Sequence, residues 1–315
     1  MQIIEDLAEF PHSLSFPVMT IGVFDGVHLG HQLILQRLTA RAKKKEGTSV
    51  ILTFTPHPQK IISPARAPLL LQTRQQKEKI LEGLDVDFML RLPFTRRLSL
   101  YSPAEFARQV LHNHGIREIH VGSNFRFGHQ RSGDIGTLTS LGEEYRFQVH
   151  EIDPVYHRQT RISSSFIRSL LAAGRVTLAR HLLGRPYQVE GIVVRGSGKG
   201  AQLSFPTANL DLGNELVPAS GVYVTRAHLN GKTYPAVTNI GVRPTLSDQT
   251  TDRPVVEPHL LDFEENIYGK HMKLDLCFRL RAEKKFDGVE DLKRQIGKDV
   301  TRTRRYMKKL TEILG

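Results

Sequence analysis

Hydrophobic runs alternate with amphipathic stretches along the first half of this chain. Continuous apolar runs, typical of buried strands, occupy residues 18–24, 49–54, 86–92 and 118–121. Between these runs, apolar residues recur with helical spacing in residues 30–45, 74–84 and 103–114. Strands that alternate with helices predict an α/β domain whose parallel sheet is covered by helices on both faces.

The pattern changes after a break at Gly184-Arg185-Pro186. Alternating apolar and polar positions, typical of half-buried strands, occupy residues 187–194, 221–225, 233–240 and 272–280. Asn230-Gly231 is a strong hairpin turn, and residues 289–314 have helical spacing. Several strands without intervening helices predict a small antiparallel β-barrel followed by a C-terminal helix. We therefore expect two domains, 1–185 and 186–315.

The composition is that of a globular protein, with 39% hydrophobic and 24% charged residues. A single cysteine, Cys277, permits no internal disulfide and no cysteine-rich metal site. The first residues, Met-Gln-Ile-Ile-Glu-Asp, lack the features of a signal peptide, and no apolar stretch is long enough to span a membrane. These features predict a cytoplasmic protein that does not associate with membranes.

The formal net charge of +12 allows two interpretations. Basic clusters can bind nucleic acid, or they can serve nucleotide substrates and leave the remainder as solvated surface. The clusters at residues 41–45 and 302–309 lie on expected helices and lack the interleaved aromatic residues of a stacking platform. Nucleic-acid binding is therefore not expected.

Residues 20–31, Thr-Ile-Gly-Val-Phe-Asp-Gly-Val-His-Leu-Gly-His, form the strongest candidate site. A strand breaks at glycines and leads into a helix whose start carries His28 and His31. Their spacing of three can place both imidazoles on one side of the chain. The free N–H groups at a helix start bind phosphate, and two imidazole donors can stabilise charge on a leaving pyrophosphate.

Three further segments carry candidate chemistry. Three serines at 163–165 can cap a helix and offer donors to an anion. Gly196-Ser-Gly-Lys-Gly200 is a flexible loop whose amides can approach phosphate, although its spacing is not that of a P-loop. Thr207 and Asn209 supply two hard oxygen atoms, which suit a magnesium ion that carries nucleotide phosphates.

The motif at 20–31 and the segment Arg161-Ile-Ser-Ser-Ser-Phe-Ile-Arg168 resemble the adenylyltransferase module of the bacterial bifunctional riboflavin kinase/FAD synthetase family. This resemblance implies a Rossmann-like nucleotidylyltransferase domain in which FMN phosphate attacks the ATP α-phosphorus and pyrophosphate leaves. The catalytic residues that it implies are His28, His31, Asn124, Arg161 and Ser164. Nucleotide contacts are expected at Gly22, Phe24, Gly30 and Arg168. The residues expected to line the flavin side of the site are Phe54, Pro56, His57 and Phe125.

The second half resembles the riboflavin kinase module of the same family. Pro-Thr-Ala-Asn at 206–209 is followed by Asn-Ile-Gly-Val-Arg-Pro-Thr at 239–245 and by Val-Glu-Pro-His at 256–259. This likeness implies that Thr207 and Asn209 hold Mg²⁺ with ATP, and that Glu257 is the general base for the ribityl hydroxyl of riboflavin. The expected phosphate loop contains Gly196, Gly198, Lys199 and Gly200.

Two positions depart from the family pattern. Ala201 stands where the family usually has arginine, and Ser204 stands where it usually has glycine. These changes leave a flavin-binding regulator without catalysis as one alternative. The other is an RNA-binding adenylating protein similar to aminoacyl-tRNA synthetases, suggested by the basic charge and His-x-Gly-His. The oligomeric state stays open.

Overall fold

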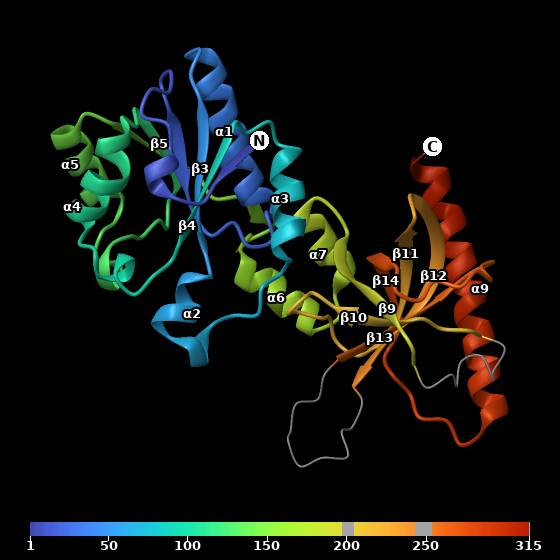
Figure 1. Cartoon of the computed structure of the whole chain (residues 1–315). Helices are drawn as coiled ribbons and strands as arrows, with labels where there is room; N and C mark the ends of the chain where they lie inside the picture. Colours follow the sequence, from blue (N-terminus) through green and yellow to red (C-terminus); the bar gives the residue numbers. More distant parts are fainter. Residues whose placement is uncertain (197–204, 243–253, 315) are drawn as a thin grey trace. The chain divides into compact units, whose positions relative to one another are not determined.

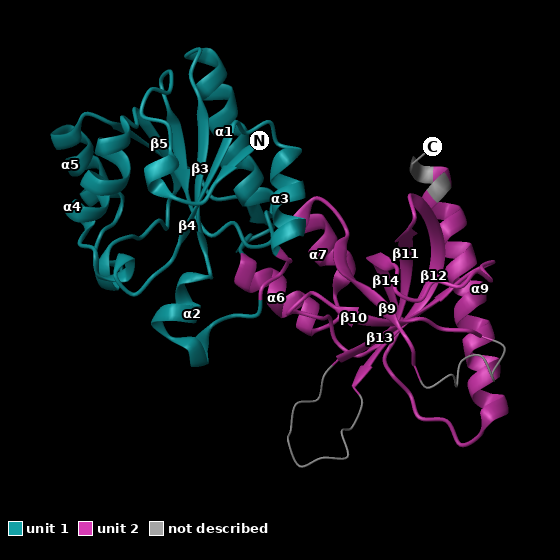
Figure 2. Cartoon of the chain, in the orientation of Figure 1, with its two compact units in different colours: residues 1–69, 74–163 teal, residues 70–73, 164–315 magenta. Residues whose placement is uncertain are grey.

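The computed structural model describes residues 1–196, 205–242 and 254–314. The chain forms two compact units (Figures 1 and 2). Unit 1 comprises Met1–Leu69 and Arg74–Ser163, and unit 2 comprises Leu70–Thr73 and Ser164–Gly315. Each unit has its own sheet and is described by itself.

Unit 1 is built on a parallel six-stranded sheet in the order β1-β4-β3-β2-β5-β6, as the alternating pattern predicts. Its strands are β1 Gln2–Ile4, β2 Val18–Ile21, β3 Ser49–Thr55, β4 Phe88–Pro93, β5 Glu118–Gly122 and β6 Gln148–Ile152. A two-stranded ribbon follows, with β7 Tyr156–His157 and β8 Thr160–Arg161. The short strands β1 and β6 lie at the edges of the sheet and were not predicted.

The helices of unit 1 cover both faces of this sheet (Figure 1). They are α1 Leu29–Lys44, α2 Pro58–Ile62, α3 Arg74–Glu82, α4 Pro103–Phe106 and α5 Ile135–Tyr145. The continuous helix expected over 103–114 is wrong in detail, because α4 passes into a π-helical turn at Ala107–Leu111 and a 3₁₀ turn at His112–His114. Ser102 caps α4 through a reciprocal capping box with Glu105.

Alternate residues of the strands face two separate apolar cores. Met19 and Leu52 join Phe106 and Leu138 in the core on the α4 and α5 side. On the other face, Val18 and Ile51 pack with Leu35 of α1 and with residues of α3. A sheet buried on both faces explains why its strands are continuous apolar runs.

Unit 2 contains an antiparallel sheet in the order β10-β9-β14-β11-β12-β13. Its strands are β9 Tyr187–Val194, β10 Asn209–Leu212, β11 Gly221–Leu229, β12 Lys232–Val242, β13 Pro254–Leu260 and β14 His271–Arg281. The two edges approach each other where the Ala208 amide donates to the Pro258 carbonyl at 2.9 Å, so the sheet is a nearly closed barrel. Asn230 and Gly231 have φ values of 50° and 76° and form the predicted hairpin turn.

Within the described residues, unit 2 has three helices. They are α6 Ser164–Ala172, α7 Val176–Leu183 and α9 Val289–Leu314, of which α9 lies alongside β12 (Figure 1). The compact units therefore part at Ser163/Ser164, whereas the sequence pattern places the domain boundary after Arg185. The short segment 70–73 also joins unit 2, where Thr73 Oγ1 donates to Glu190 at 2.9 Å and the Leu70 amide donates to Glu215 at 3.0 Å. The functional division at 185/186 stays a prediction.

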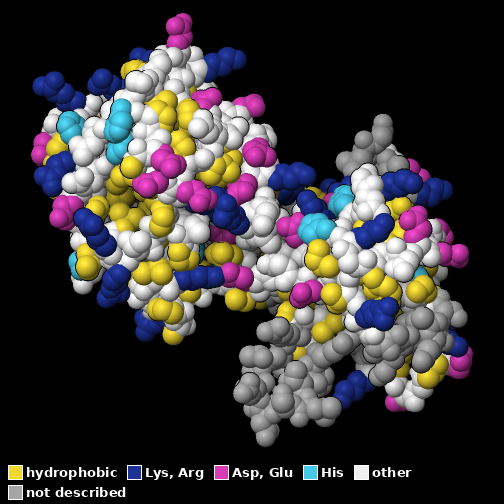
Figure 3. Space-filling view, in the orientation of Figure 1, with side chains coloured by type: hydrophobic (Ala, Val, Ile, Leu, Met, Phe, Trp, Pro, Cys, Tyr) yellow, Lys and Arg dark blue, Asp and Glu magenta, His cyan; other side chains and the backbone are white. Residues whose placement is uncertain are grey.

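No helix in the described part of the chain is long and apolar enough to cross a membrane. On the face seen in Figure 3, Lys and Arg side chains are scattered among acidic and apolar ones.

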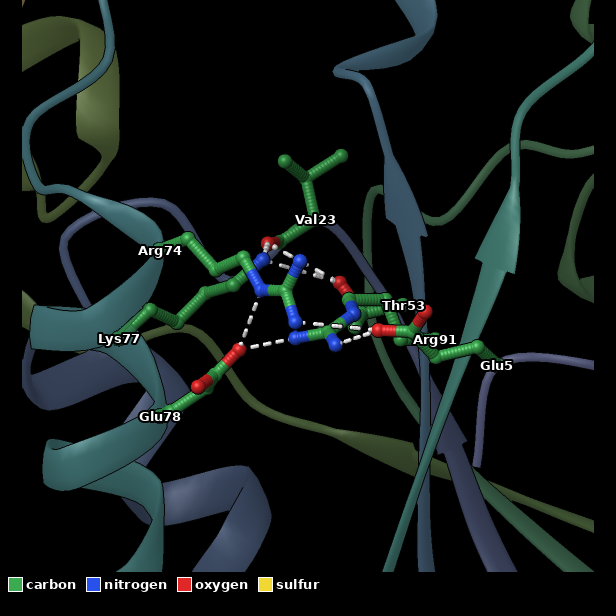
Figure 4. Close-up of polar contacts among 7 residues, drawn as sticks. All are labelled: Glu5, Val23, Thr53, Arg74, Lys77, Glu78 and Arg91. Atoms are coloured by element: carbon green, nitrogen blue, oxygen red, sulfur yellow. Dashed lines mark hydrogen bonds and ion pairs between the residues drawn. The ribbon is translucent and has the colours of Figure 1, made fainter. Parts of the chain in front are cut away.

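A buried guanidinium links three elements of unit 1 (Figure 4). Arg91 of β4 is 4% exposed and forms ion pairs with Glu5 and Glu78. Arg74 contacts the same two carboxylates, at 3.1 and 2.8 Å, but its side chain is 56% exposed. Burial lowers the pKa of Arg91, and the two carboxylates compensate the charge that this guanidinium carries.

We predict that Arg91→Met lowers the free energy of unfolding by about 2–3 kcal/mol, because it removes charge-assisted hydrogen bonds from a buried guanidinium to Glu5 and Glu78. Arg74→Met removes an exposed cation from the same carboxylates and is expected to cost less than about 1 kcal/mol. Urea unfolding followed by circular dichroism measures both. Equal losses in the two variants would contradict a special role for the buried cation.

Candidate functional site

The order in which the chain adds strands to the unit 1 sheet reverses between β2 and β5. From β2 the chain continues to β3 and β4 on one side, while β5 and β6 lie on the other. In open parallel sheets, ligands bind outside the carboxyl ends of the strands at such a switch point. The His28 motif follows β2 and Asn124 follows β5, so both lie at this end of the sheet.

The turn between β2 and α1 has an unusual backbone. Phe24, Gly26 and Val27 have φ values of 52°, 83° and 37°. Positive φ is strained for phenylalanine and for β-branched valine. Both side chains are buried in the core beside α1, and Gln32 donates from Nε2 to the Val27 carbonyl at 2.8 Å. Core packing and this hydrogen bond therefore fix the path of the turn.

His28 is the N-cap of α1. Its Nδ1 accepts the His31 amide at 3.3 Å, so the neutral ring carries its proton on Nε2 as a donor. The two imidazoles are stacked, with 3.7 Å between ring centroids, and the Phe24 ring lies edge-on to His31 at 5.2 Å. The predicted pairing of His28 and His31 at a helix start is therefore present, on the first turn of a 16-residue helix.

Gly30 and Gly22 allow close packing around these rings. A Cβ at residue 30 would lie 3.1 Å from His28 Cε1 and 3.9 Å from the Ile162 carbonyl oxygen. Phe24 lies over Gly22, where an added Cβ would be 3.1 Å from its ring. Gly30 thus brings the segment around Arg161 next to the start of α1.

Asn124 and Arg161 form the other side of this site. Arg161 Nη2 donates to Asn124 Oδ1 at 2.7 Å. A Cβ on Gly122, the last residue of β5, would lie 3.7 Å from Asn124 Oδ1, 3.9 Å from Arg161 Nη2 and 3.6 Å from Ile34 of α1. The structure therefore brings Asn124, Arg161 and the histidine helix to one end of the sheet.

The residues expected on the flavin side differ in burial and in the neighbours that they contact. Phe54 and Phe125 are half-buried against the core on the α4 and α5 side. Phe54 contacts Phe94 edge-on at 5.5 Å, whereas Phe125 stacks on Phe127 at 5.5 Å. Pro56 is exposed, and His57 caps α2 by accepting the Gln59 amide at 3.1 Å.

Ser164 and Arg168 lie on α6, which belongs to unit 2. Both are half-buried. The predicted helix start in the serine run is present, since α6 begins at Ser164.

Lys77 of α3 was not predicted as a site residue. Its Nζ lies 3.4 Å from both the Val23 carbonyl and Thr53 Oγ1, at the carboxyl ends of β2 and β3 (Figure 4). Burial lowers the pKa of Lys77, while Asp25 and Glu78 act in the opposite direction. In the sequence, Lys77 is simply a lysine within a charged helix, so no local pattern marks it as a site residue.

In unit 2, Gly196 and Asn209 approach very closely. A Cβ at residue 196 would lie 2.0 Å from Asn209 Nδ2, so only glycine fits beside this carboxamide. Asn209 is the first residue of β10 and is 8% exposed. The predicted phosphate-loop residues Gly198, Lys199 and Gly200, and the departures Ala201 and Ser204, lie outside the described residues.

The segment that carries Thr207 lies beside β13. The Ala208 amide donates to Pro258, and His259 Nδ1 is 2.8 Å from the Pro206 carbonyl. Glu257 on β13 is half-buried and pairs in register with Asn239 of β12. Thr207 is exposed. Thr207 and Asn209 flank Ala208, whose amide donates to Pro258, the residue after Glu257.

Two family models match this chain. The FAD synthetase model matches residues 11–166, and the riboflavin kinase model matches residues 183–307.

The chain is 34% identical over 295 residues to the bifunctional riboflavin kinase/FMN adenylyltransferase of Bacillus subtilis, with 93% of each chain covered. It is 38% identical to the protein of the same name from Pseudomonas fluorescens, over 91% of this chain and 92% of that one. A crystal structure named as a macrolide-efflux protein from Streptococcus pneumoniae is 28% identical, with a TM-score of 0.86 over 96% of this chain and 98% of that one. From the family matches and the relatives that span both units, this chain belongs to the bifunctional riboflavin kinase/FMN adenylyltransferase family.

Proposed function

We propose that this chain phosphorylates riboflavin to FMN and adenylylates FMN to FAD, with adenylyl transfer at the His28 site and phosphorylation at the Asn209 site. Relatives that cover more than nine tenths of the chain carry both activities in their names. The observation that carries the assignment is the stacked histidine pair at the start of α1, which lies at the same end of the sheet as the hydrogen bond between Asn124 and Arg161.

In adenylyl transfer, an FMN phosphate oxygen attacks the α-phosphorus of ATP. A new P–O bond forms, the bond to the β-phosphate bridge oxygen breaks, and pyrophosphate leaves with the electron pair. His28 donates through Nε2–H, and the amides at the start of α1 add partial positive charge. His31 and Arg161 complete the cationic side, where negative charge grows on the leaving group.

The supporting residues position the two substrates. Asn124 holds the Arg161 guanidinium in place. Gly22, Phe24 and Gly30 shape the backbone beneath the histidines. For Ser164 and Arg168, the proposed role as phosphate donors rests on the sequence motif alone. Phe54, Pro56, His57 and Phe125 accommodate the flavin of FMN. Chemistry in this unit consists of positioning and charge stabilisation and forms no covalent enzyme intermediate.

In unit 2, the ribityl hydroxyl of riboflavin attacks the γ-phosphorus of ATP. Glu257 accepts the hydroxyl proton, the new P–O bond forms, and ADP leaves with the electrons of the broken bond. A half-buried carboxylate at a strand edge can align the attacking oxygen.

Thr207 and Asn209 fit a Mg²⁺ ion by their chemistry. Both offer neutral oxygen donors, and the Asn209 carboxamide is held tightly against Gly196. Mg²⁺ prefers oxygen ligands and usually binds through a few protein groups together with substrate phosphates. When bound there, it neutralises charge on the ATP phosphates. We also propose a reducing cytoplasm as the location, consistent with a single cysteine, Cys277, whose burial raises the pKa of the thiol to about 11.

The direct test is incubation of the purified chain with riboflavin, ATP and Mg²⁺, with the flavins resolved by chromatography. Both FMN and FAD are expected, and omission of Mg²⁺ with a chelator present should stop both reactions. Tight flavin binding with no turnover would favour a regulator instead, and salt-sensitive tRNA binding would favour the RNA-binding alternative.

We predict that His28→Ala lowers the rate of FAD formation from FMN by about 10²–10³-fold, because it removes a donor to developing charge. FMN formation from riboflavin should stay within about twofold, since unit 2 has its own site. Glu257→Ala should give the reverse pattern, with a loss of about 10²–10⁴-fold in phosphorylation. Each variant is the control for the other, and equal loss of both activities in either one would contradict two separate sites.

We further predict that Gly196→Ala reduces riboflavin phosphorylation at least about 10-fold, because the added methyl displaces the Asn209 carboxamide and a small misplacement is costly in catalysis. Gly288→Ala is the matched control in unit 2, since a Cβ there meets no atom within 4 Å among the described residues. Steady-state kinetics of both reactions measure the outcome. Unchanged phosphorylation in Gly196→Ala would remove Asn209 from the proposed site.

A further inference from the structure

A second polar cluster lies on strands β5 and β6 of unit 1, away from their carboxyl ends. Glu118 and His120 are two residues apart on β5 and therefore face the same side, and His120 is paired in register with His150 of β6. One ligand atom from each of the three side chains lies within 4.8 Å of the others.

The imidazoles of this cluster lack hydrogen-bond partners. Within the described ranges, neither ring nitrogen of His120 forms a hydrogen bond, nor does Nε2 of His150. His120 is only 5% exposed, so water does not readily replace the missing partners. Buried polar groups are nearly always satisfied, and an exception calls for an explanation such as an ion.

The missing partner has a defined position. Glu118 Oε2 lies 3.6 Å from His120 Nε2 and 3.3 Å from His150 Nε2. An ion bound tetrahedrally at about 2.0–2.1 Å separates neighbouring ligand atoms by about 3.3–3.4 Å. Two of the three distances between ligand atoms are thus close to those of such a site, and the third is within 4.8 Å.

Arg41 of α1 prepares the carboxylate for this role. Its Nε and Nη2 donate to Glu118 at 2.7 and 2.6 Å, which fixes the orientation of the carboxylate. A carboxylate has about four lone-pair positions, so two donors leave room for an ion on Oε2. Ligating carboxylates are commonly held by hydrogen bonds of this kind.

We propose that Glu118, His120 and His150 bind one divalent transition-metal ion of the zinc class. Two imidazoles and one carboxylate match the preferences of zinc and differ from the all-oxygen ligands of Mg²⁺. The His150 side chain is 37% exposed, so water can reach the fourth coordination position. The ion ties β5 to β6 and stabilises the edge of the sheet.

This site is separate from the nucleotide site and does not rest on the proposed function. Glu118 is the first residue of β5, and Asn124 follows the end of that strand. At about 3.3 Å per residue, Glu118 lies about 13 Å from Gly122 along the strand.

The test uses the full chain, stripped with a chelator and titrated with Co²⁺ in Mg²⁺-free buffer. We expect about one equivalent of Co²⁺ to give a tetrahedral visible absorption band that Zn²⁺ displaces. Zn²⁺ should also raise the thermal unfolding midpoint, because it binds the folded state. His120→Asn and His150→Asn should each weaken Co²⁺ binding at least about 10-fold and abolish the Zn²⁺-dependent shift.

Three controls make the result decisive. His12→Asn alters another stacked histidine pair of unit 1, with His114 at 5.3 Å, and should leave the Co²⁺ band unchanged. His31→Asn should also retain the band. His150→Asn changes a partly exposed residue, so its circular dichroism should match the parent protein even if the buried His120→Asn variant unfolds. Absence of the band, its persistence in His150→Asn, or its loss in His31→Asn would overturn the proposal.

Discussion

The site of unit 1 depends on the strained turn that joins β2 to α1. Phe24 and Val27 hold positive φ angles that their side chains disfavour, and burial of those side chains offsets the strain. Because the turn is fixed from inside the core, the first turn of α1 and the His28 ring point to the carboxyl end of the sheet. The distance between the histidines and the Asn124–Arg161 bond therefore follows from core packing rather than from the polar residues themselves.

The same parallel sheet presents different chemistry along its strands. At the carboxyl end, helix amides, imidazoles and a guanidinium suit phosphates. In the amino-terminal half of β5 and β6, imidazoles and a carboxylate gather beside Arg41 and suit a small cation. Buried polar groups such as Arg91 and Lys77 connect α3 to the central strands between these regions. Each group requires its partner because the sheet is buried on both faces.

Unit 2 offers a different setting for its proposed site. Among the described residues, the candidate groups there lie on or beside strands of the barrel, at Asn209 of β10 and Glu257 of β13. Gly196 against Asn209 and Ala208 against Pro258 set the spacing there. Each unit folds around its own sheet, so the residues near Asn209 are positioned by other packing than those near His28.

The sequence by itself determined the features that arise from local periodicity and turn chemistry. The bounds of β9 and α9, the Asn230-Gly231 hairpin and the histidine-bearing helix start all agree with the pattern. Tertiary structure decided the edge strands β1 and β6, the break after α4, and the assignment of α6 and α7 to unit 2, since these depend on long-range packing. It also decided which polar residues meet. His150 lies 30 residues from His120, and the parallel pairing of β5 with β6 brings them together. Arg161 lies 37 residues from Asn124, on the separate β7–β8 ribbon, and long-range packing brings these two together.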